Sequence, residues 1–300
     1  MELNKIAENI LKYIPNRFRS IMCKIPLPDN LTEIRFYSNR GIAFFTDKLI
    51  GFLSDSCDIV KEFDSHCIKV TSDDCKFILM SVCKNSVYSH QRELNEGCFV
   101  IENGIRVGLS GRFSEGQGQT IQEISSINFR ISREKTGCAE QIYESTKGNS
   151  LLICGGVNTG KTTILRDLSR LYGNHTKCTL IDEHNEISAM NSGIPSFDIG
   201  LTTDIINGKS RHNGIIASIR TLSPEYIMCD EIADSDDVNA IVSASGSGVK
   251  IIATMHCPSY QDFQQRPVAK QLMNYQIFSY AVFLKNMGQV DRIVDLRMHR

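Results

Sequence analysis

The segment from Gly155 to Thr162 constrains this chain more than any other part of its sequence. It reads G-x-x-x-x-G-K-T, it follows the apolar run Leu151–Cys154, and apolar residues return at helical spacing after it. In such a strand–turn–helix unit, successive backbone N–H groups surround phosphate oxygens, and the helix N-terminus adds a positive potential. The pattern therefore predicts a phosphate-binding loop, or P-loop, for a nucleoside triphosphate.

Two side chains of this loop have specific expected roles. Lys161 would reach the β and γ phosphates of ATP, and the Thr162 hydroxyl would ligate Mg²⁺. The full set of residues expected to bind the nucleotide is Gly155, Gly156, Val157, Asn158, Thr159, Gly160, Lys161, Thr162 and Thr163.

The chain after Gly137 contains continuous apolar runs. They cover residues 151–154, 178–181, 226–229, 250–255 and 278–284, and longer segments, several of them helix-like, separate them. Strands that are buried on both faces of a parallel sheet have this pattern, whereas half-exposed strands alternate. We therefore expect residues 137–300 to form an α/β domain with a mainly parallel sheet.

The first 136 residues have a mixed pattern. Helical spacing covers residues 5–14 and 73–84, and short strands are expected at 32–36, 41–45 and between 97 and 132. Asn103-Gly104 between two alternating runs predicts a hairpin, and a second turn is expected at residues 116–119. Residues 1–136 should therefore form a smaller α+β domain.

The charge balance argues against a protein that binds nucleic acid through its overall charge. The chain has 33 basic and 34 acidic residues and a net charge of −1, so it has no global field that would attract DNA or anionic lipid. No window approaches the roughly 18 apolar residues of a membrane span, and the charged N-terminus does not resemble a signal peptide. We expect an intracellular protein that associates with membranes only through protein partners.

The eleven cysteines do not form a metal-binding pattern. No C-x-x-C pair occurs, and Cys154, Cys178 and Cys229 lie inside apolar runs. Free cysteine in a reducing compartment usually behaves as a small buried hydrophobe, so we expect neither zinc nor disulfides.

Pairs of acidic residues follow two of the predicted strands. Asp230-Glu231 ends the run 226–229 in the form expected of a Walker B strand, and Asp182-Glu183 ends the run 178–181. Asp230 and Asp182 are candidate Mg²⁺ ligands, and Glu231 or Glu183 would polarise the attacking water; the sequence leaves the choice between these two glutamates open.

His256 and three arginines complete the candidate set. His256 follows the strand at 250–255 and would sense the γ phosphate through a hydrogen bond. Phosphoryl transfer also uses an arginine, often from a neighbouring subunit or domain. Arg220 is the main candidate, with Arg130 and Arg133 as others.

These motifs resemble those of known families. The P-loop, the acidic pairs and the T-x-H at Thr254–His256 are similar in order to the secretion ATPases of bacterial type II and type IV systems. More closely, E-I-R at 33–35, R-V-G-L-S-G-R at 106–112, I-S-S-I-N-F-R-I-S-R-E at 124–134 and D-E-H-N-E-I at 182–187 resemble the stage III sporulation protein AA family. This chain departs from that family in its P-loop, which lacks the usual proline, at His184 in place of arginine, and at Cys257 in place of glycine.

The resemblance implies a RecA-like P-loop ATPase core that forms a hexamer. It implies Asp182-Glu183 as the Asp box, Asp230-Glu231 as Walker B and His256 as the His box. The family is thought to act in the mother-cell cytoplasm, at the forespore membrane, with the other stage III sporulation membrane channel proteins. Two other functions remain open, a nucleotide-gated scaffold with little turnover and a RecA-like nucleic-acid translocase; the neutral charge argues against the translocase.

Overall fold

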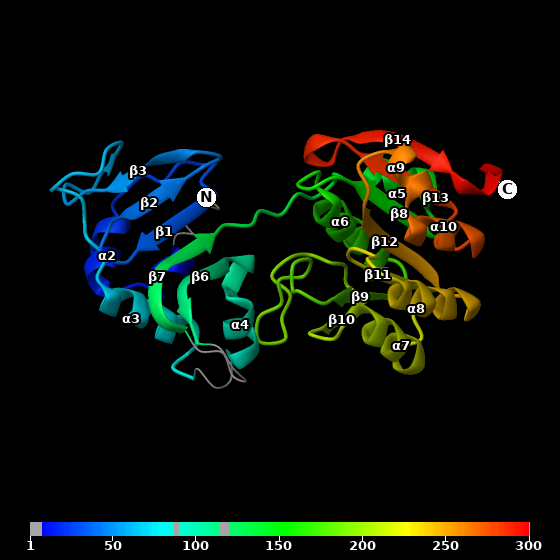
Figure 1. The fold of residues 1–300 in the computed structure, drawn as a ribbon, viewed down its shortest axis with the longest axis horizontal. Helices are drawn as coiled ribbons and strands as arrows, with labels where there is room; N and C mark the ends of the chain where they lie inside the picture. Colours follow the sequence, from blue (N-terminus) through cyan, green and yellow to red (C-terminus); the bar gives the residue numbers. More distant parts are fainter. Residues whose placement is uncertain (1–7, 87–89, 115–120, 300) are drawn as a thin grey trace. The chain divides into compact units, whose positions relative to one another are not determined.

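A computed structural model describes residues 8–86, 90–114 and 121–299 of the chain. The chain divides into two compact units, Met1–Arg133 and Glu134–Arg300, each with its own sheet (Figure 1). The division falls three residues before the boundary expected from the sequence. The expected turn at 116–119 lies outside the described residues.

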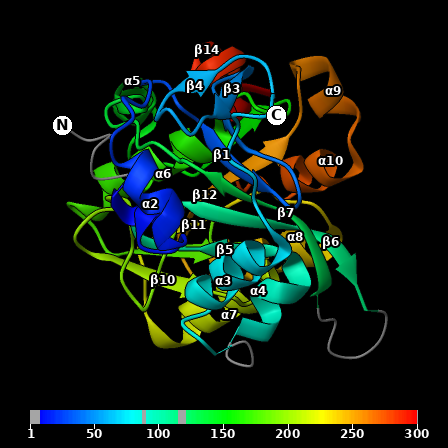
Figure 2. The same cartoon turned by 90° about the vertical axis from the view of Figure 1, so that its left-hand side faces the viewer.

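The first unit is an antiparallel sheet covered by helices. Its described strands lie in the order β4-β3-β2-β1-β7-β6-β5. Figures 1 and 2 show α2 and α3 against this sheet, and Phe18 and Ile78 from these helices share one buried core with Phe36 and Phe129 of the strands. The elements are α2 (Asn16–Met22), β1 (Glu33–Tyr37), β2 (Ile42–Phe45), β3 (Leu49–Leu53), β4 (Ile59–Val60), α3 (Ser72–Val82), α4 (Gln91–Glu96), β5 (Cys98–Val100), β6 (Arg106–Phe113) and β7 (Ile121–Arg130).

The predicted hairpin at Asn103-Gly104 connects β5 to β6. Asn103 and Gly104 have φ angles of 57° and 67°, the left-handed conformation that Asn and Gly tolerate best in tight hairpin turns. Phe99 pairs with Val107 across the antiparallel ladder. The sequence prediction of this hairpin is confirmed.

The second unit is a mainly parallel α/β sheet. Its described strands lie in the order β10-β9-β11-β12-β8-β13-β14, and only β14 pairs in the antiparallel sense. The elements are α5 (Glu140–Thr146), β8 (Leu151–Gly155), α6 (Lys161–Gly173), β9 (Cys178–Asp182), β10 (Thr203–Asn207), α7 (Arg211–Thr221), β11 (Tyr226–Cys229), α8 (Ser235–Gly246), β12 (Lys250–His256), α9 (Tyr260–Gln265), α10 (Pro267–Asn274), β13 (Tyr280–Leu284) and β14 (Val290–Asp295).

Both faces of this sheet are buried, which explains the continuous apolar runs. In β8, Leu151 and Ile153 belong to a core on the α6 side, whereas Leu152 and Cys154 belong to a second core with residues of α7, α8 and α9. Because the six strands β8 to β13 all run parallel, their carboxyl ends lie at one edge of the sheet. The α/β expectation for this part of the chain is confirmed.

The cysteines are free. Burial raises the pKa of Cys229 to about 12, so this thiol is protonated at neutral pH and acts as a small apolar side chain. Among the described residues, no cluster of three or more His, Cys, Asp or Glu side chains is placed to bind a metal ion. None of the described helices combines the length and the apolar character needed to cross a bilayer.

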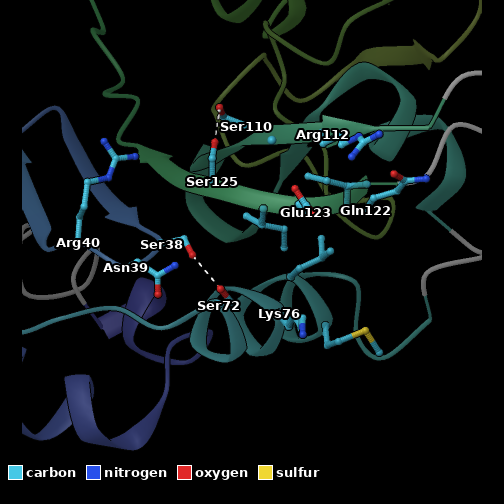
Figure 3. Close-up of a pocket in the computed structure, with 15 residues that line it drawn as sticks. Ser38, Asn39, Arg40, Ser72, Lys76, Ser110, Arg112, Gln122, Glu123 and Ser125 are labelled. Atoms are coloured by element: carbon cyan, nitrogen blue, oxygen red, sulfur yellow. Dashed lines mark hydrogen bonds between the residues drawn. The ribbon is translucent and has the colours of Figure 1, made fainter.

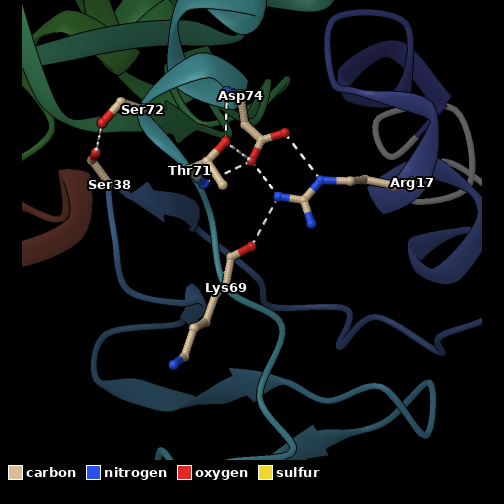
Figure 4. Close-up of polar contacts among 6 residues, drawn as sticks. All are labelled: Arg17, Ser38, Lys69, Thr71, Ser72 and Asp74. Carbon is tan, nitrogen blue, oxygen red and sulfur yellow. Dashed lines mark hydrogen bonds and ion pairs between the residues drawn. The ribbon is translucent and has the colours of Figure 1, made fainter.

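The first turn of α3 is fixed by a network around Asp74 (Figure 4). Asp74 and Thr71 form a capping box, and Arg17 of α2 donates to the Asp74 carboxylate and to the Lys69 carbonyl. Burial alone would raise the pKa of Asp74, but the hydrogen bonds from Arg17 and Thr71 outweigh it and hold this pKa below its usual value. The carboxylate therefore stabilises the unit in its ionised form.

Asp74→Asn is expected to lower the free energy of unfolding of the first unit by about 1–3 kcal/mol at neutral pH, because it removes charge-assisted hydrogen bonds. The native pKa is depressed, so this contribution is present above about pH 4 and disappears as the pH falls through the native pKa. Urea unfolding, with hydrogen exchange of the α3 amides to report on this unit, measures the loss. Asp73→Asn, at an exposed neighbour, is the matched control; an equal loss in both variants would contradict the role of Asp74.

Candidate nucleotide-binding site

The P-loop connects β8 to α6 through a tight turn. Asn158 and Gly160 have φ angles of 58° and 93°, and the Thr159 hydroxyl donates to the Gly156 carbonyl at 3.0 Å. A Cβ atom at position 155 would lie 2.3 Å from Thr159 Oγ1, so only glycine fits there. The turn leaves the backbone N–H groups at the start of α6 without helical partners, as anion binding requires.

Lys161 lies against this loop. Its ammonium donates to the carbonyls of Gly155 and Gly156 at 3.1 and 2.8 Å. The Gly155 carbonyl also accepts from the Cys257 N–H at 3.1 Å, which joins the loop to the end of β12. The expected phosphate-binding cation is therefore at the loop, held by the carbonyls that precede it.

Asp230 lies between two threonine hydroxyls. Thr162 Oγ1 donates to Asp230 Oδ2 at 3.4 Å, and Thr254 Oγ1 donates to Asp230 Oδ1 at 2.7 Å. Asp230 follows β11, and Thr254 is on the neighbouring strand β12. The role of Thr254 was missed from the sequence; the available signal was a lone hydroxyl within the apolar run 250–255.

The side chains of Thr162 and Asp230 fit a magnesium ion. A hydroxyl and a carboxylate are hard oxygen donors, and Mg²⁺ in phosphate sites takes only one or two protein ligands beside water and phosphate oxygens. Their oxygens already lie 3.4 Å apart, at the first turn of the helix that follows the P-loop. The structure thus brings the two donors together at the place where the sequence expects them.

Asp182 is fully engaged in a turn. Its Oδ1 accepts from the N–H groups of Glu186 and Ile187 at 2.9 and 3.2 Å, and its Oδ2 accepts from the N–H and hydroxyl of Ser188 at 2.8 and 2.6 Å. The side chain is 2% exposed. A metal ion would have to displace these donors, so the metal-ligand role of Asp182 stays a prediction.

A buried arginine, also missed from the sequence, fixes this turn to the P-loop helix. Arg166 of α6 donates to the carbonyls of Ile187 and Glu186 at 2.6 and 2.8 Å, and its guanidinium lies 4.0 Å from the centre of the Phe197 ring. The segment after β9 is thereby attached to the helix that begins with Lys161.

Glu183 is held by Arg211 at the start of α7. Its carboxylate accepts from the Arg211 N–H at 3.3 Å and lies 3.6 Å from the guanidinium, which also forms an ion pair with Asp237 at 2.6 Å. The Ala233 N–H donates to the same Asp237 carboxylate at 3.0 Å. One network therefore links Glu183 to the segment that follows Glu231; Arg211 had no sequence signal beyond its charge.

The remaining candidates occupy different places. Glu231 is exposed just after β11, and half-buried His256 lies opposite Gly155 in the β12–β8 register. Arg220 is exposed in the last turn of α7, about 13 Å along the helix axis from Arg211 and near the amino ends of the strands. Within this unit, Arg220 is therefore at the edge opposite the P-loop.

Arg130 and Arg133 belong to the first unit. Arg130 lies 3.9 Å from the Glu33 carboxylate, and Arg133 donates to the Leu31 carbonyl at 3.0 Å. Both arginines thus have structural contacts within their own unit, and their expected part in catalysis stays a prediction.

The fold is that of the RecA-like secretion and pilus ATPases. The chain is similar to the ATPase DotB of Legionella pneumophila, with a TM-score of 0.51 and 14% identity over 85% of this chain and 72% of that one. It is also similar to the pilus retraction motor PilT, solved with bound ADP, with a TM-score of 0.55 and 15% identity over 88% and 77% of the two chains.

The sequence comparisons identify a narrower group than the fold does. Residues 4–300 match the family model for sporulation stage III, protein AA, and the chain belongs to that family. It is 31% identical to the stage III sporulation protein AA of Bacillus subtilis (strain 168), over 98% of this chain and 95% of that protein. The resemblance stated from the sequence motifs is confirmed.

Asp182→Asn is expected to destabilise the second unit by about 1–3 kcal/mol in the absence of nucleotide and metal, because an amide cannot accept all four hydrogen bonds. Hydrogen exchange of the amides at 186–188, together with thermal unfolding, measures this. Asp204→Asn, at an exposed position of β10, is the matched control. Unchanged protection of these amides combined with a weaker Mg²⁺ affinity would assign Asp182 to the metal instead.

Proposed function

We propose that this chain hydrolyses ATP and thereby energises or assembles the channel complex between mother cell and forespore during sporulation. Membership of the sporulation stage III protein AA family and the secretion-ATPase fold support this proposal. The chain would act as a homo-hexamer at the mother-cell side of the forespore membrane. The other stage III sporulation channel proteins would recruit it there, and no nucleic acid would be needed.

One observation carries the proposal. The Asp230 carboxylate at the end of β11 lies between the hydroxyls of Thr162 and Thr254, beside a P-loop whose lysine is in position. The carboxylate and its two hydroxyl donors come from three separate segments of the sequence. A merely structural aspartate would not need the first turn of the P-loop helix as its partner.

Each part of the site would have a distinct role. The backbone N–H groups of residues 155–162 would bind the phosphates, and Lys161 would leave its carbonyl partners to neutralise phosphate charge. Thr162 and Asp230 would hold Mg²⁺, which neutralises the charge of the β and γ phosphates when bound. His256, opposite Gly155, would donate a hydrogen bond towards the γ phosphate.

Of the two candidate glutamates, we propose Glu231 as the residue that polarises the attacking water. The Glu183 carboxylate is engaged with the backbone N–H and the guanidinium of Arg211, and these contacts compete with a water molecule for its oxygens. Glu231 is exposed, and among the described residues no ion-pair partner is assigned to it. Glu183 would instead position the segment after β11 through Arg211 and Asp237.

Arg220 would act on the site of a neighbouring subunit. Its position near the amino ends of the strands separates it from the P-loop of its own unit, and its side chain is exposed. An arginine supplied from another subunit is a recurring device for stabilising the charge of a phosphoryl-transfer transition state.

Mg²⁺-dependent ATP hydrolysis by the purified chain, with channel partners added, tests the proposal. Lys161→Ala should lower hydrolysis about 100-fold or more, since one preorganised charge at a transition state contributes about 10²–10³ in rate. Glu231→Gln should retain ATP binding but lose about 10²–10⁴ in rate. Hydrolysis by the unsubstituted chain no higher than by Lys161→Ala would contradict the proposal.

Further arms of this experiment separate the alternatives. A mixture of Glu231→Gln and Arg220→Ala chains should regain activity, because one chain supplies the glutamate and its neighbour the arginine. Sporulation supported by Glu231→Gln would favour a nucleotide-gated scaffold. Stimulation of hydrolysis by DNA at low salt would favour a translocase.

A further inference from the structure

The first unit contains an open groove of about 1050 Å³ between α3 and the strands β6 and β7. In Figure 3, α3 and residues 122–125 of β7 face this space, and the turn at Ser38–Arg40 closes one end. The groove is lined by residues of the first unit only, whereas the nucleotide site belongs to the second unit. The inference drawn from the groove does not depend on the function proposed above.

One wall of the groove is the edge of β7 that faces away from β6. The β1 register on β7 ends at Tyr37 and Ser126, and the Ser38 N–H donates to the Ser125 carbonyl at 2.9 Å. The chain then turns away, so residues 121–124 of β7 continue beyond β1. Their other edge pairs with β6, and no strand of the described residues pairs with the edge at the groove. Such an edge can accept an added strand.

The β6–β7 ladder contains two register shifts, between Ser110 and Gly111 and between Arg112 and Phe113. Each shift turns the following side chains of β7, with the result that both Ile121 and Ile124 pack against the core. Gly111 is required at the first shift, because a Cβ there would lie 1.9 Å from the Glu123 carbonyl oxygen. The glycine at position 111 therefore permits the irregular pairing of β6 with β7.

The side chains around this edge combine apolar surface with positive charge. Met80 of α3 is 38% exposed, and the groove is lined by three cations, Arg40, Lys76 and Arg112, against one carboxylate, Glu123. Lys76 is 3.2 Å from Asp73, but both side chains are exposed, so this pair is weak. The lining thus favours an apolar ligand that carries negative charge.

The groove walls are fixed before any ligand binds. The Asp74 network attaches the first turn of α3 to α2 (Figure 4), and the hydroxyls of Ser38 and Ser72 lie 3.1 Å apart across the groove end. On the strand side, the hydroxyls of Ser110 and Ser125 lie 3.0 Å apart. A site that is already ordered loses little conformational entropy on binding.

We propose that this groove binds an extended acidic segment of a partner protein, which adds as a strand along residues 121–124 of β7. Backbone hydrogen bonds to the free edge would supply affinity, as in other cases of strand addition. Acidic side chains of the segment would lie beside Arg40, Lys76 and Arg112, and its apolar side chains would contact Met80. Electrostatic complementarity of this kind sets specificity and association rate.

Fluorescence anisotropy with the full chain tests this proposal without nucleotide. The probe is a labelled peptide of alternating Glu and Val, and saturable binding is expected. The double variant Arg40→Glu/Arg112→Glu should weaken binding at least tenfold. Lys24→Glu/Lys48→Glu changes the net charge equally at exposed positions outside the groove and should bind like the unsubstituted chain. Thermal unfolding verifies that both variants are folded.

A second probe tests the backbone contacts. The same peptide, N-methylated at alternate residues, keeps its charges but loses hydrogen-bond donors, and it should bind at least tenfold more weakly. Hydrogen exchange at residues 121–124 should slow on binding of the unmethylated peptide. Equal affinity for both peptides, equal affinity in both charge variants, or absence of saturable binding would overturn the proposal. So would groove-dependent binding of a thymidine oligonucleotide in place of the peptide.

Discussion

The parallel order of the second sheet is the constraint on which the rest of the nucleotide site depends. Burial of both faces selects continuous apolar strands, and their parallel direction brings the ends of β8, β9, β11 and β12 to one edge. The P-loop, the two acidic pairs and the T-x-H segment are far apart in the sequence but meet at that edge. The hydrogen bonds from Thr162 and Thr254 to Asp230 form because the parallel strands end side by side at that edge.

Local sequence patterns were enough to predict the P-loop and the buried strands of the second unit. The phosphate-binding turn is a short-range feature that requires glycine at fixed positions, and the buried strands are recognisable by composition. The edge strands β10 and β14 were not predicted, because their side chains are partly exposed and carry no continuous apolar run. Arg166, Arg211 and Thr254 were missed because their partners are 20 or more residues away in the chain, and pairings at that range depend on the fold.

The acidic pairs show the same limit. Their position at strand ends was readable from the sequence, but their surroundings were not. Both carboxylate oxygens of Asp182 accept hydrogen bonds from the turn at Glu186–Ser188, whereas Asp230 accepts from two threonine hydroxyls beside the P-loop. Two aspartates in equivalent places along neighbouring strands thus have different chemistry. The groove of the first unit likewise depends on strand pairing. It lies where β7 extends beyond the end of β1, and no local sequence pattern predicts where that pairing ends.

The central claim is that Thr162 and Asp230 together hold the metal that accompanies ATP. Titration calorimetry of ATP, with and without Mg²⁺, tests it most directly when the unsubstituted chain is compared with Asp230→Asn. The account predicts that Mg²⁺ strengthens ATP binding in the unsubstituted chain and that Asp230→Asn abolishes most of this gain while leaving metal-free binding nearly unchanged. An equal Mg²⁺ dependence in both proteins would contradict it.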